Sequence, residues 1–363
     1  MRVLVLNGPN LDRLGTREPE VYGSEKLAEL EEGITSAGEA LGIEVETIQS
    51  NHEGELIDRV NTSDHDGLVI NPGALAHTSR ALADSIRSVP APAVEVHITN
   101  IREREAWRSR SLVSETCVRS IYGRGARGYS DALRHLVNRA AHPAETVRYG
   151  PHPDNVGDLR RGEGGVIVLA HGGFWRHEWE RDTMDSLAVH LAENGRATLN
   201  IEYRRIGAGG GWPGSAHDIV MALDFIPQLG LDSGPISVVG HSAGGHLAMW
   251  AVTRASVTVS RLTALAPLVD LERHAESDLY GAVEARRLLD SGAPRRVDPG
   301  DAPTTLVHGS EDELVPLEHS RLLETRDNVE LLTPDVGHFE LLDPARGWSD
   351  YLVDTRGGWR AGT

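Results

Sequence analysis

An arginine and a tyrosine stand five residues apart in the segment REPEVYG, residues 17–23. A phenol with a pKa of about 10 is a weak base at neutral pH, but a guanidinium beside it favours the phenolate and lowers that pKa. Arg17 can therefore make Tyr22 a usable general base. Gly15 and Gly23 flank the segment and would let it hinge over a substrate and exclude water. A solvated loop without a catalytic role is the alternative.

A second constellation is typical of a nucleophilic serine. The motif GHSAGG, residues 240–245, fits G-x-S-x-G between the strand-like ISVV and the helical HLAMWAV, so a tight turn would lift the Ser242 hydroxyl clear of the backbone. Asp312 follows the strand-like TTLVHGS, and His338 follows VELLTP. In this order the histidine can take the serine proton while the aspartate holds the imidazole. Taken singly, His338 could be a loop histidine and Asp312 a helix cap.

The motif HGGFW, residues 171–175, could stabilise the charge that such a reaction develops. It follows the strand-like run VIVLA. Past that strand the backbone N–H groups of Gly173 and Phe174 could join that of Ala243 to form an oxyanion hole. Together with the serine, aspartate and histidine, this motif predicts acyl transfer to water.

Short apolar runs alternate with helical patterns over residues 1–141, as in a parallel sheet covered on both faces. Five strand-like runs are VLVLN (3–7), IEVETIQS (43–50), DGLVINPG (66–73), PAVEVH (92–97) and SIY (120–122). This pattern predicts a flavodoxin-like doubly wound domain, whose ligands bind beyond the carboxyl ends of the strands. The residues that matter for chemistry should then lie at 7–10, 71–77 and 97–100.

Composition changes after the helical segment 130–141, where the chain becomes rich in proline, glycine and charge, as at a domain boundary. A second alternation follows and predicts another α/β domain. Its strand-like runs are GVIVLAHGG (165–173), RATLNIEYR (196–204), ISVVGHSAGG (236–245), LTALAPL (262–268), TTLVHGS (304–310) and VELLTP (329–334). We expect a first domain at 1–141, a linker and entry segment at 142–163, and a second domain at 146–363.

Composition excludes several classes of protein. A chain of 363 residues exceeds what one core usually organises, so two domains are expected. Its 39% hydrophobic and 25% charged residues are typical of a globular protein. Its formal net charge of -18 argues against nucleic acid or an anionic membrane as a partner, because both need a basic face. Neither a leader-like N-terminal segment nor a long apolar run occurs, so we expect a cytoplasmic location. Cys117, the only cysteine, excludes an intramolecular disulfide framework and a thiolate zinc cluster.

Lys26 is the only lysine among 36 basic residues. Arginine stays protonated and cannot act as an amine nucleophile, so Schiff-base chemistry has one possible carrier. The segment NGPNLDRLG after the first strand differs from the G-x-G-x-x-G phosphate loop, which disfavours a mononucleotide-binding module.

Five motifs in register resemble those of type II 3-dehydroquinate dehydratases. They are LNGPNL, RLGTREPEVYG, SNHEGELID, INPGALAHTS and EVHITN, and the resemblance covers residues 1–141. It implies a flavodoxin-like fold, trimers grouped into dodecamers, and removal of water from 3-dehydroquinate to give 3-dehydroshikimate through an enolate. The unrelated type I enzymes, which use a Schiff-base lysine in a barrel, do not fit a chain with one lysine.

The resemblance also implies a role for each matched residue. Tyr22 is the base that takes the proton beside the carbonyl, Arg17 activates it, and His97 is the acid that protonates the departing hydroxyl. By the same resemblance Glu95 orients His97, and Asn10 holds a water at the developing enolate. Asn71, His77 and Arg108 bind the ring hydroxyls, and Ile98 and Thr99 bind the carboxylate. Asp84 reaches into a neighbouring subunit's site and helps to deprotonate the tyrosine. An imidazole, with a pKa of about 6.5, suits the acid role at physiological pH.

Residues 146–363 resemble α/β-hydrolases of the esterase and arylformamidase group, with which they share the HGGxW element and a YGPHP-like entry. The resemblance implies that Ser242 attacks an acyl carbon, His338 shuttles the proton and Asp312 holds the imidazole. It leaves the acyl group open. Three tryptophans could line a pocket for an aromatic substrate or simply pack: Trp175, Trp179 and Trp212.

We interpret the chain as a bifunctional enzyme in which a dehydratase domain is fused to a serine hydrolase domain, each acting on a small molecule. The alternative is that one domain is a non-catalytic assembly or binding scaffold. No cofactor, metal, nucleic acid or membrane partner is expected. We expect a homo-oligomer built from trimers, up to a dodecamer.

Overall fold

The structure is a computed structural model, and it describes residues 1–16, 24–231 and 234–346. The chain divides into two compact units, Met1–Ala140 and Ala141–Thr363. No helix among the described residues is long and apolar enough to cross a membrane.

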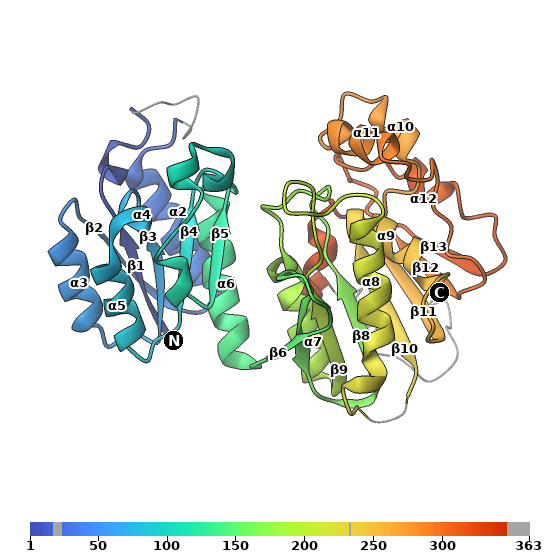
Figure 1. The fold of residues 1–363 in the computed structure, drawn as a ribbon, viewed down its shortest axis with the longest axis horizontal. Helices are drawn as coiled ribbons and strands as arrows, with labels where there is room; N and C mark the ends of the chain where they lie inside the picture. The colour runs from blue at the N-terminus through green and yellow to red at the C-terminus, as the bar shows by residue number, and fades with distance from the viewer. Residues whose placement is uncertain (17–23, 232–233, 347–363) are drawn as a thin grey trace. The chain divides into compact units, whose positions relative to one another are not determined.

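The first unit is a five-stranded, fully parallel sheet in the order β2-β1-β3-β4-β5 (Figure 1). The strands are β1 Arg2–Asn7, β2 Glu44–Gln49, β3 Gly67–Asn71, β4 Ala93–His97 and β5 Arg119–Tyr122. The helices are α2 Leu27–Ala40, α3 Glu53–Asn61, α4 Leu75–Thr78, α5 Arg80–Ser88 and α6 Arg127–Ala141, and the short 3-10 turns are Leu11–Arg13, Ile101–Glu103, Ala106–Arg108 and Ser114–Thr116. This is the expected flavodoxin-like doubly wound arrangement.

Both faces of that sheet are covered, and the side chains of β1 show how. Val3 and Val5 pack in one core with residues of α2 and α6, whereas Leu4 and Leu6 pack in another with residues of α3 and α5. All four side chains are fully buried. Because successive residues of a strand point to opposite faces, a strand covered on both sides has apolar residues in succession, as residues 3–6, VLVL, show.

The second unit is an eight-stranded sheet in the order β13-β12-β11-β10-β8-β9-β7-β6. Its strands are β6 Glu145–Arg148, β7 Val156–Arg160, β8 Glu163–Ala170, β9 Arg196–Ile201, β10 Ile236–His241, β11 Val259–Leu265, β12 Thr304–Val307 and β13 Val329–Leu332. Strands β8 to β13 pair in parallel, whereas β7 is antiparallel to both β9 and β6. This is the α/β-hydrolase type of sheet that we expected.

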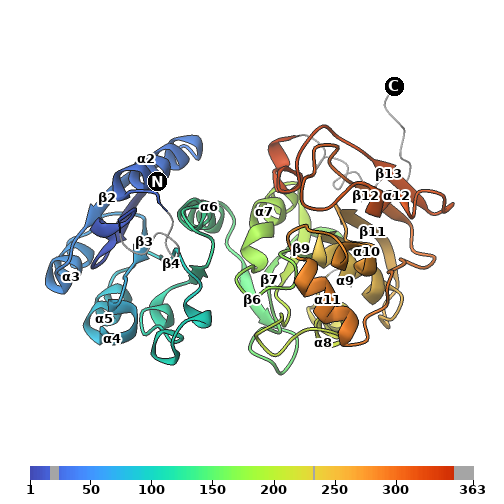
Figure 2. The same cartoon turned by 90° about the horizontal axis from the view of Figure 1, so that it is seen from above.

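Helices cover both faces of the second sheet as well (Figure 2). Its helices are α7 Asp185–Glu193, α8 Gly214–Phe225, α9 Ala243–Val252, α10 Leu271–Ala275, α11 Ala282–Asp290 and α12 Glu318–Arg321, and its 3-10 turns are Arg181–Met184, Ile226–Gln228, Glu340–Leu342 and Pro344–Arg346. Side chains of α8 and α9 share a core with Val166 and Val168 of β8. Side chains of α7 share a second core with Ile167 and Leu169 of the same strand.

The segment 142–163, which we expected to be a linker and entry to the second domain, contains β6 and β7. The two strands form an antiparallel pair at the end of the sheet. Their apolar pattern is weak because two buried positions of β7 hold charged side chains with polar partners. Asp158 accepts from Arg181 Nε at 2.7 Å, and Arg160 Nε donates to the His142 carbonyl at 2.9 Å.

Candidate active sites

The first unit has a pocket at the carboxyl ends of β1, β3 and β4, where a parallel sheet of this type places ligands. Seven of the predicted residues line it: Asn10, Asn71, His77, His97, Ile98, Thr99 and Arg108. Arg17 and Tyr22 lie outside the described residues. Asp84 does not line the pocket of its own chain. It lies on α5, exposed, with Oδ1 at 2.9 Å from Arg87 Nη1.

His97 is held by a carboxylate on its own strand. Glu95 and His97 are two residues apart on β4, so their side chains leave the same face, and Glu95 Oε1 lies 3.0 Å from His97 Nε2. Glu95 is fully buried and also accepts the hydroxyls of Ser111 at 2.6 Å and Ser120 at 3.1 Å. Since a carboxylate only accepts, Nε2 carries a proton and Nδ1 is the nitrogen left to exchange one. The sequence did not point to either serine.

His77 has its tautomer fixed by the backbone. Its Nδ1 lies 2.8 Å from the carbonyl oxygen of Arg110, so Nδ1 donates and Nε2 is left as an acceptor. Its ring lies nearly parallel to that of His97, with centroids 6.5 Å apart, and nearly perpendicular to that of Trp107, with centroids 5.4 Å apart. A neutral His77 can therefore accept a hydrogen bond from a hydroxyl in the pocket.

Two asparagines of the pocket are fixed from behind. Asn10 adopts a left-handed conformation with φ 68, which asparagine tolerates, and its N–H donates to Asn51 Oδ1 at 2.7 Å. Asn71 Nδ2 donates to the Tyr129 hydroxyl at 2.9 Å, and that hydroxyl donates to Asn7 Oδ1 at 2.7 Å. Burial raises the pKa of Tyr129, which keeps it a neutral donor. Tyr129 is a positioning residue that sequence reasoning missed.

The pocket is more cationic than the sequence indicated. Arg13 and Arg104 line it in addition to Arg108. Arginines at the rim of a pocket favour an anionic ligand. Arg104 belongs to none of the five motifs, and Arg13 opens RLGTREPEVYG but was given no role.

In the second unit, Ser242 lies at the apex of the turn from β10 to α9. Its φ of 53 and ψ of -118 are strained for a serine, as a nucleophile elbow requires. The turn is possible because its glycines approach other backbone closely: a Cβ on Gly244 would lie 2.2 Å from the Ala170 carbonyl oxygen, and one on Gly240 would lie 2.7 Å from Gly245 Cα. Among the described residues, the buried Ser242 Oγ has no hydrogen-bond partner.

Asp312 and His338 form the pair that the sequence predicted. Asp312 Oδ2 lies 2.6 Å from His338 Nδ1, and Oδ1 accepts the backbone N–H groups of Leu314 and Val315, each at 2.9 Å. Burial would raise the pKa of Asp312, but the hydrogen bond from His338 and those backbone donors together hold it below its usual value. The ionised carboxylate therefore keeps the proton of His338 on Nδ1 and leaves Nε2 as the acceptor.

The HGG turn, which includes one of the predicted oxyanion donors, lies next to the serine. A Cβ on Gly172 would be 2.9 Å from Ser242 Cβ, which places the HGG turn against the nucleophile. Gly173 and Phe174 have φ of 106 and 50. Ala243 is the first residue of α9, so its N–H has no acceptor within the helix.

The predicted tryptophans divide into core and site residues. Trp175 is fully buried and meets His246 edge-on, with centroids 5.4 Å apart. Trp212 packs edge-on against Trp250 at 5.0 Å. Trp179 lies against Gly173, where a Cβ would come within 2.2 Å of it, and stacks on Phe339, next to His338, at 5.7 Å.

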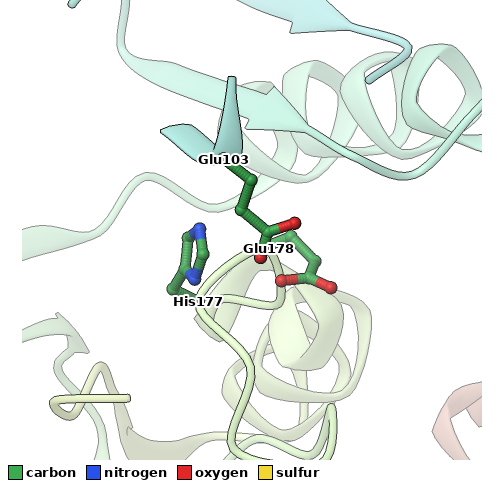
Figure 3. A group of neighbouring side chains, drawn as sticks. All are labelled: Glu103, His177 and Glu178. Carbon is green, nitrogen blue, oxygen red and sulfur yellow. The ribbon is translucent and has the colours of Figure 1, made fainter. Parts of the chain in front are cut away.

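Figure 3 draws the side chains of Glu103, His177 and Glu178. Glu103 belongs to the first unit, whereas His177 and Glu178 belong to the second. We assign these residues to neither site.

Comparison with known proteins identifies the first unit. A family model described as Dehydroquinase class II matches residues 1–137. A 3-dehydroquinate dehydratase of Bacillus cereus (strain AH820) is 46% identical over 140 residues, which are 38% of this chain and 96% of that protein. The chain belongs to the type II dehydroquinase family.

Two further type II dehydroquinases are similar to this chain. The 3-dehydroquinate dehydratase of Bordetella avium (strain 197N) is 48% identical over 138 residues, 37% of this chain and 96% of that protein. The solved type II dehydroquinase of Butyrivibrio crossotus DSM 2876 is 44% identical, with a TM-score of 0.37, and the match covers 38% of this chain and 97% of that one. The dehydroquinase unit thus spans nearly the full length of these relatives.

The second unit matches a different family model, described as BD-FAE, over residues 158–264. Similar solved structures include one titled Bacterial Heroin Esterase, 24% identical with a TM-score of 0.49, over 62% of this chain and 87% of that one. Another is an esterase/lipase from an uncultured bacterium, 20% identical with a TM-score of 0.48, over 61% of this chain and 87% of that one.

Proposed function

We propose that this type II dehydroquinase is a bifunctional enzyme. Its first unit dehydrates 3-dehydroquinate to 3-dehydroshikimate through an enolate, and its second unit hydrolyses an ester or amide with a nucleophilic serine. The observation that supports the first activity is the buried Glu95–His97 pair opening into a pocket lined by the predicted binding residues. The second is supported by the Asp312–His338 pair together with the strained Ser242 turn.

In the dehydratase reaction, Tyr22, activated by Arg17, removes the proton beside the carbonyl. Asn10 holds a water at the developing enolate oxygen. His97 then protonates the departing hydroxyl, and Glu95 stabilises the imidazolium that precedes this transfer.

Binding of the substrate is divided between hydroxyl and carboxylate contacts. We assign Asn71, His77 and Arg108 to the ring hydroxyls, and Ile98 and Thr99 to the carboxylate. Nε2 of His77 is suited to this role because it can only accept.

Asp84, exposed on α5, would complete the site of a neighbouring subunit. A homo-oligomer built from trimers would supply that contact.

Formation of the conjugated product can be followed by its ultraviolet absorbance. Tyr22→Phe and His97→Ala should each lower kcat by a factor of about 10² to 10⁴, the span for a positioned acid or base. His52→Ala is a matched control, because His52 is exposed at the start of α3 and does not line the pocket. Full activity in either catalytic variant would disprove the assignment.

In the hydrolase reaction, His338 takes the proton of Ser242 as its hydroxyl attacks the acyl carbon. Asp312 stabilises the resulting imidazolium, and the N–H groups of Gly173, Phe174 and Ala243 bind the oxyanion. A serine hydroxyl is a weak nucleophile without an adjacent base, so its reactivity reports a working histidine.

A fluorophosphonate should therefore label Ser242, and activated short-chain esters such as 4-nitrophenyl acetate should be hydrolysed. Ser242→Ala should abolish both. If the folded protein is neither labelled nor active, the second unit is a scaffold and only the dehydratase is catalytic.

A further inference from the structure

The HGG turn beside Ser242 rests on a buried histidine–carboxylate pair that the proposed mechanism does not use. Strands β8 and β9 are parallel neighbours with Ala170 opposite Ile201, so the residues that follow them, His171 and Glu202, lie side by side. His171 Nε2 lies 2.8 Å from Glu202 Oε1, and both side chains are almost completely buried. A buried carboxylate kept beside an oxyanion turn calls for an explanation.

The other ring nitrogen of His171 contacts the turn itself. Nδ1 lies 2.7 Å from the carbonyl oxygen of Gly172. Both partners of the ring, a carboxylate and a carbonyl, only accept hydrogen bonds, so the ring satisfies both when each nitrogen carries a proton. Tyr203 stacks on the ring with centroids 4.4 Å apart and donates its hydroxyl to the His171 carbonyl at 2.8 Å, which fixes the plane of the imidazole.

This contact sets the direction of an oxyanion donor. The peptide that joins Gly172 to Gly173 is trans, so its C=O and N–H point in opposite directions. A hydrogen bond that fixes the Gly172 carbonyl on His171 therefore aims the Gly173 N–H away from His171. The ideal Cβ of Gly172 lies 2.9 Å from Ser242 Cβ, so the turn is within reach of the nucleophile.

The partners of Glu202 favour its ionised form. Its Oε1 lies 3.0 Å from Arg205 Nη1, and its Oε2 accepts the Arg181 N–H at 3.1 Å. Burial alone would raise the pKa of Glu202, but Arg205 and His171 hold it well below its usual range. The carboxylate is therefore charged at all pH values at which the enzyme would work.

We propose that Glu202 and His171 are positioning residues of the hydrolase site: the chain of hydrogen bonds from Glu202 through His171 to the Gly172 carbonyl aims the Gly173 N–H at the oxyanion. This inference rests on the proposed hydrolase function. The relay acts on the transition state and not on substrate binding, because it orients a donor whose partner gains its charge only during the reaction.

The variant Glu202→Gln tests the relay. A glutamine carbonyl can still accept from His171 Nε2, so volume and one hydrogen bond persist, but a neutral imidazole has a single N–H and cannot also serve the Gly172 carbonyl. We expect kcat for 4-nitrophenyl acetate to fall by a factor of about 10 to 10², approaching the loss of one oxyanion donor, with KM nearly unchanged. The inhibition constant of a trifluoromethyl ketone, which mimics the tetrahedral intermediate, should rise by the same factor.

Asp158→Asn is the matched control. It removes a carboxylate that accepts a hydrogen bond from Arg181 Nε at 2.7 Å. Arg181 also lies 3.6 Å from Glu202, so the variant changes the same group of charges without removing a partner of His171. It should lower the unfolding midpoint about as much as Glu202→Gln and leave kcat and the inhibition constant near wild type. Equal kcat losses in the two variants would show that Glu202 serves only stability and would overturn the proposal.

Solid-state ¹⁵N spectra give a readout that needs neither activity nor the Glu202 variant. With His171 assigned by its loss in His171→Gln, the wild-type ring should show two protonated nitrogens. A ring with only one protonated nitrogen would overturn the relay, even if the protein is an active esterase. If His171 shows two protonated nitrogens but a fluorophosphonate fails to label the protein, the relay stands and the hydrolase function is rejected.

Discussion

Asp312→Asn should nearly abolish the proposed hydrolase activity for a reason that can be read from its hydrogen bonds. Oδ1 of Asp312 accepts two backbone N–H groups, from Leu314 and Val315 at 2.9 Å each, so the oxygen of an asparagine must take that place. Its NH₂ group then replaces Oδ2, which lies 2.6 Å from His338 Nδ1. An NH₂ group donates, which forces His338 Nδ1 to accept and moves its proton to Nε2.

A histidine protonated on Nε2 cannot take the proton of Ser242. The expected loss in kcat is a factor of about 10⁴, as for the wrong tautomer in other serine hydrolases, which corresponds to about 5.5 kcal/mol of transition-state stabilisation. The assay is hydrolysis of 4-nitrophenyl acetate at saturating ester, with Glu311→Gln as the control because Glu311 is the exposed neighbour of Asp312. Activity within tenfold of wild type in a folded Asp312→Asn enzyme would refute the reasoning.

The same variant has a signature in acid. The folded pKa of Asp312 is depressed, so its ionised form stabilises the fold above the unfolded pKa of about 3.9, and this contribution is lost as pH falls through the folded pKa. The wild-type protein should therefore lose stability more steeply below about pH 4 than Asp312→Asn does. Unfolding midpoints measured from pH 2 to pH 7 would show the difference, and parallel curves would contradict it.

Three further predictions concern the dehydratase and the relation of the two activities. Tyr129→Phe leaves buried Asn71 Nδ2 and Asn7 Oδ1 without the hydroxyl between them, so the first unit should lose about 2 to 4 kcal/mol of stability in urea unfolding and bind 3-dehydroquinate more weakly. An unchanged unfolding midpoint would exclude this role. Borohydride added with substrate should leave the dehydratase active, and Lys26→Arg should retain its rate, because no imine forms; inactivation that requires substrate would indicate a Schiff base. Ser242→Ala should leave the dehydratase rate unchanged, and Tyr22→Phe should leave the rate of ester hydrolysis unchanged. A dehydratase that sediments as a monomer and is fully active would contradict the intersubunit role of Asp84.

Residues at the end of a buried strand could be predicted from the sequence, because apolar runs such as VLVLN and ISVVGH mark where strands end. Asn71 and His97, the last residues of β3 and β4, were singled out in this way, and so was Ser242, which follows β10. Tyr129 and Glu202 were not. Tyr129 meets Asn71 from 58 residues away, and Glu202 meets His171 from 31 residues away. Such contacts depend on strand order and register, which no local pattern encodes.

Strand pairing at the start of the second sheet was missed for a related reason. Asp158 and Arg160 occupy buried positions of β7, and their charges interrupt the apolar run by which a strand buried on both faces is recognised. Paired charges can therefore occupy buried positions in a segment whose composition suggests a domain boundary.

The hairpin of β6 and β7 also determines where the second unit can be cut from the chain. β7 covers the flank of β9, a strand buried at every position, RATLNI. A fragment that began after residue 161 would leave unpaired the N–H and C=O groups that β9 directs to β7, and such an open strand edge is a template for aggregation. An expression fragment that includes residue 145 onward keeps that edge closed, so insolubility of a shorter fragment would reflect its starting point and not an inability of the unit to fold alone.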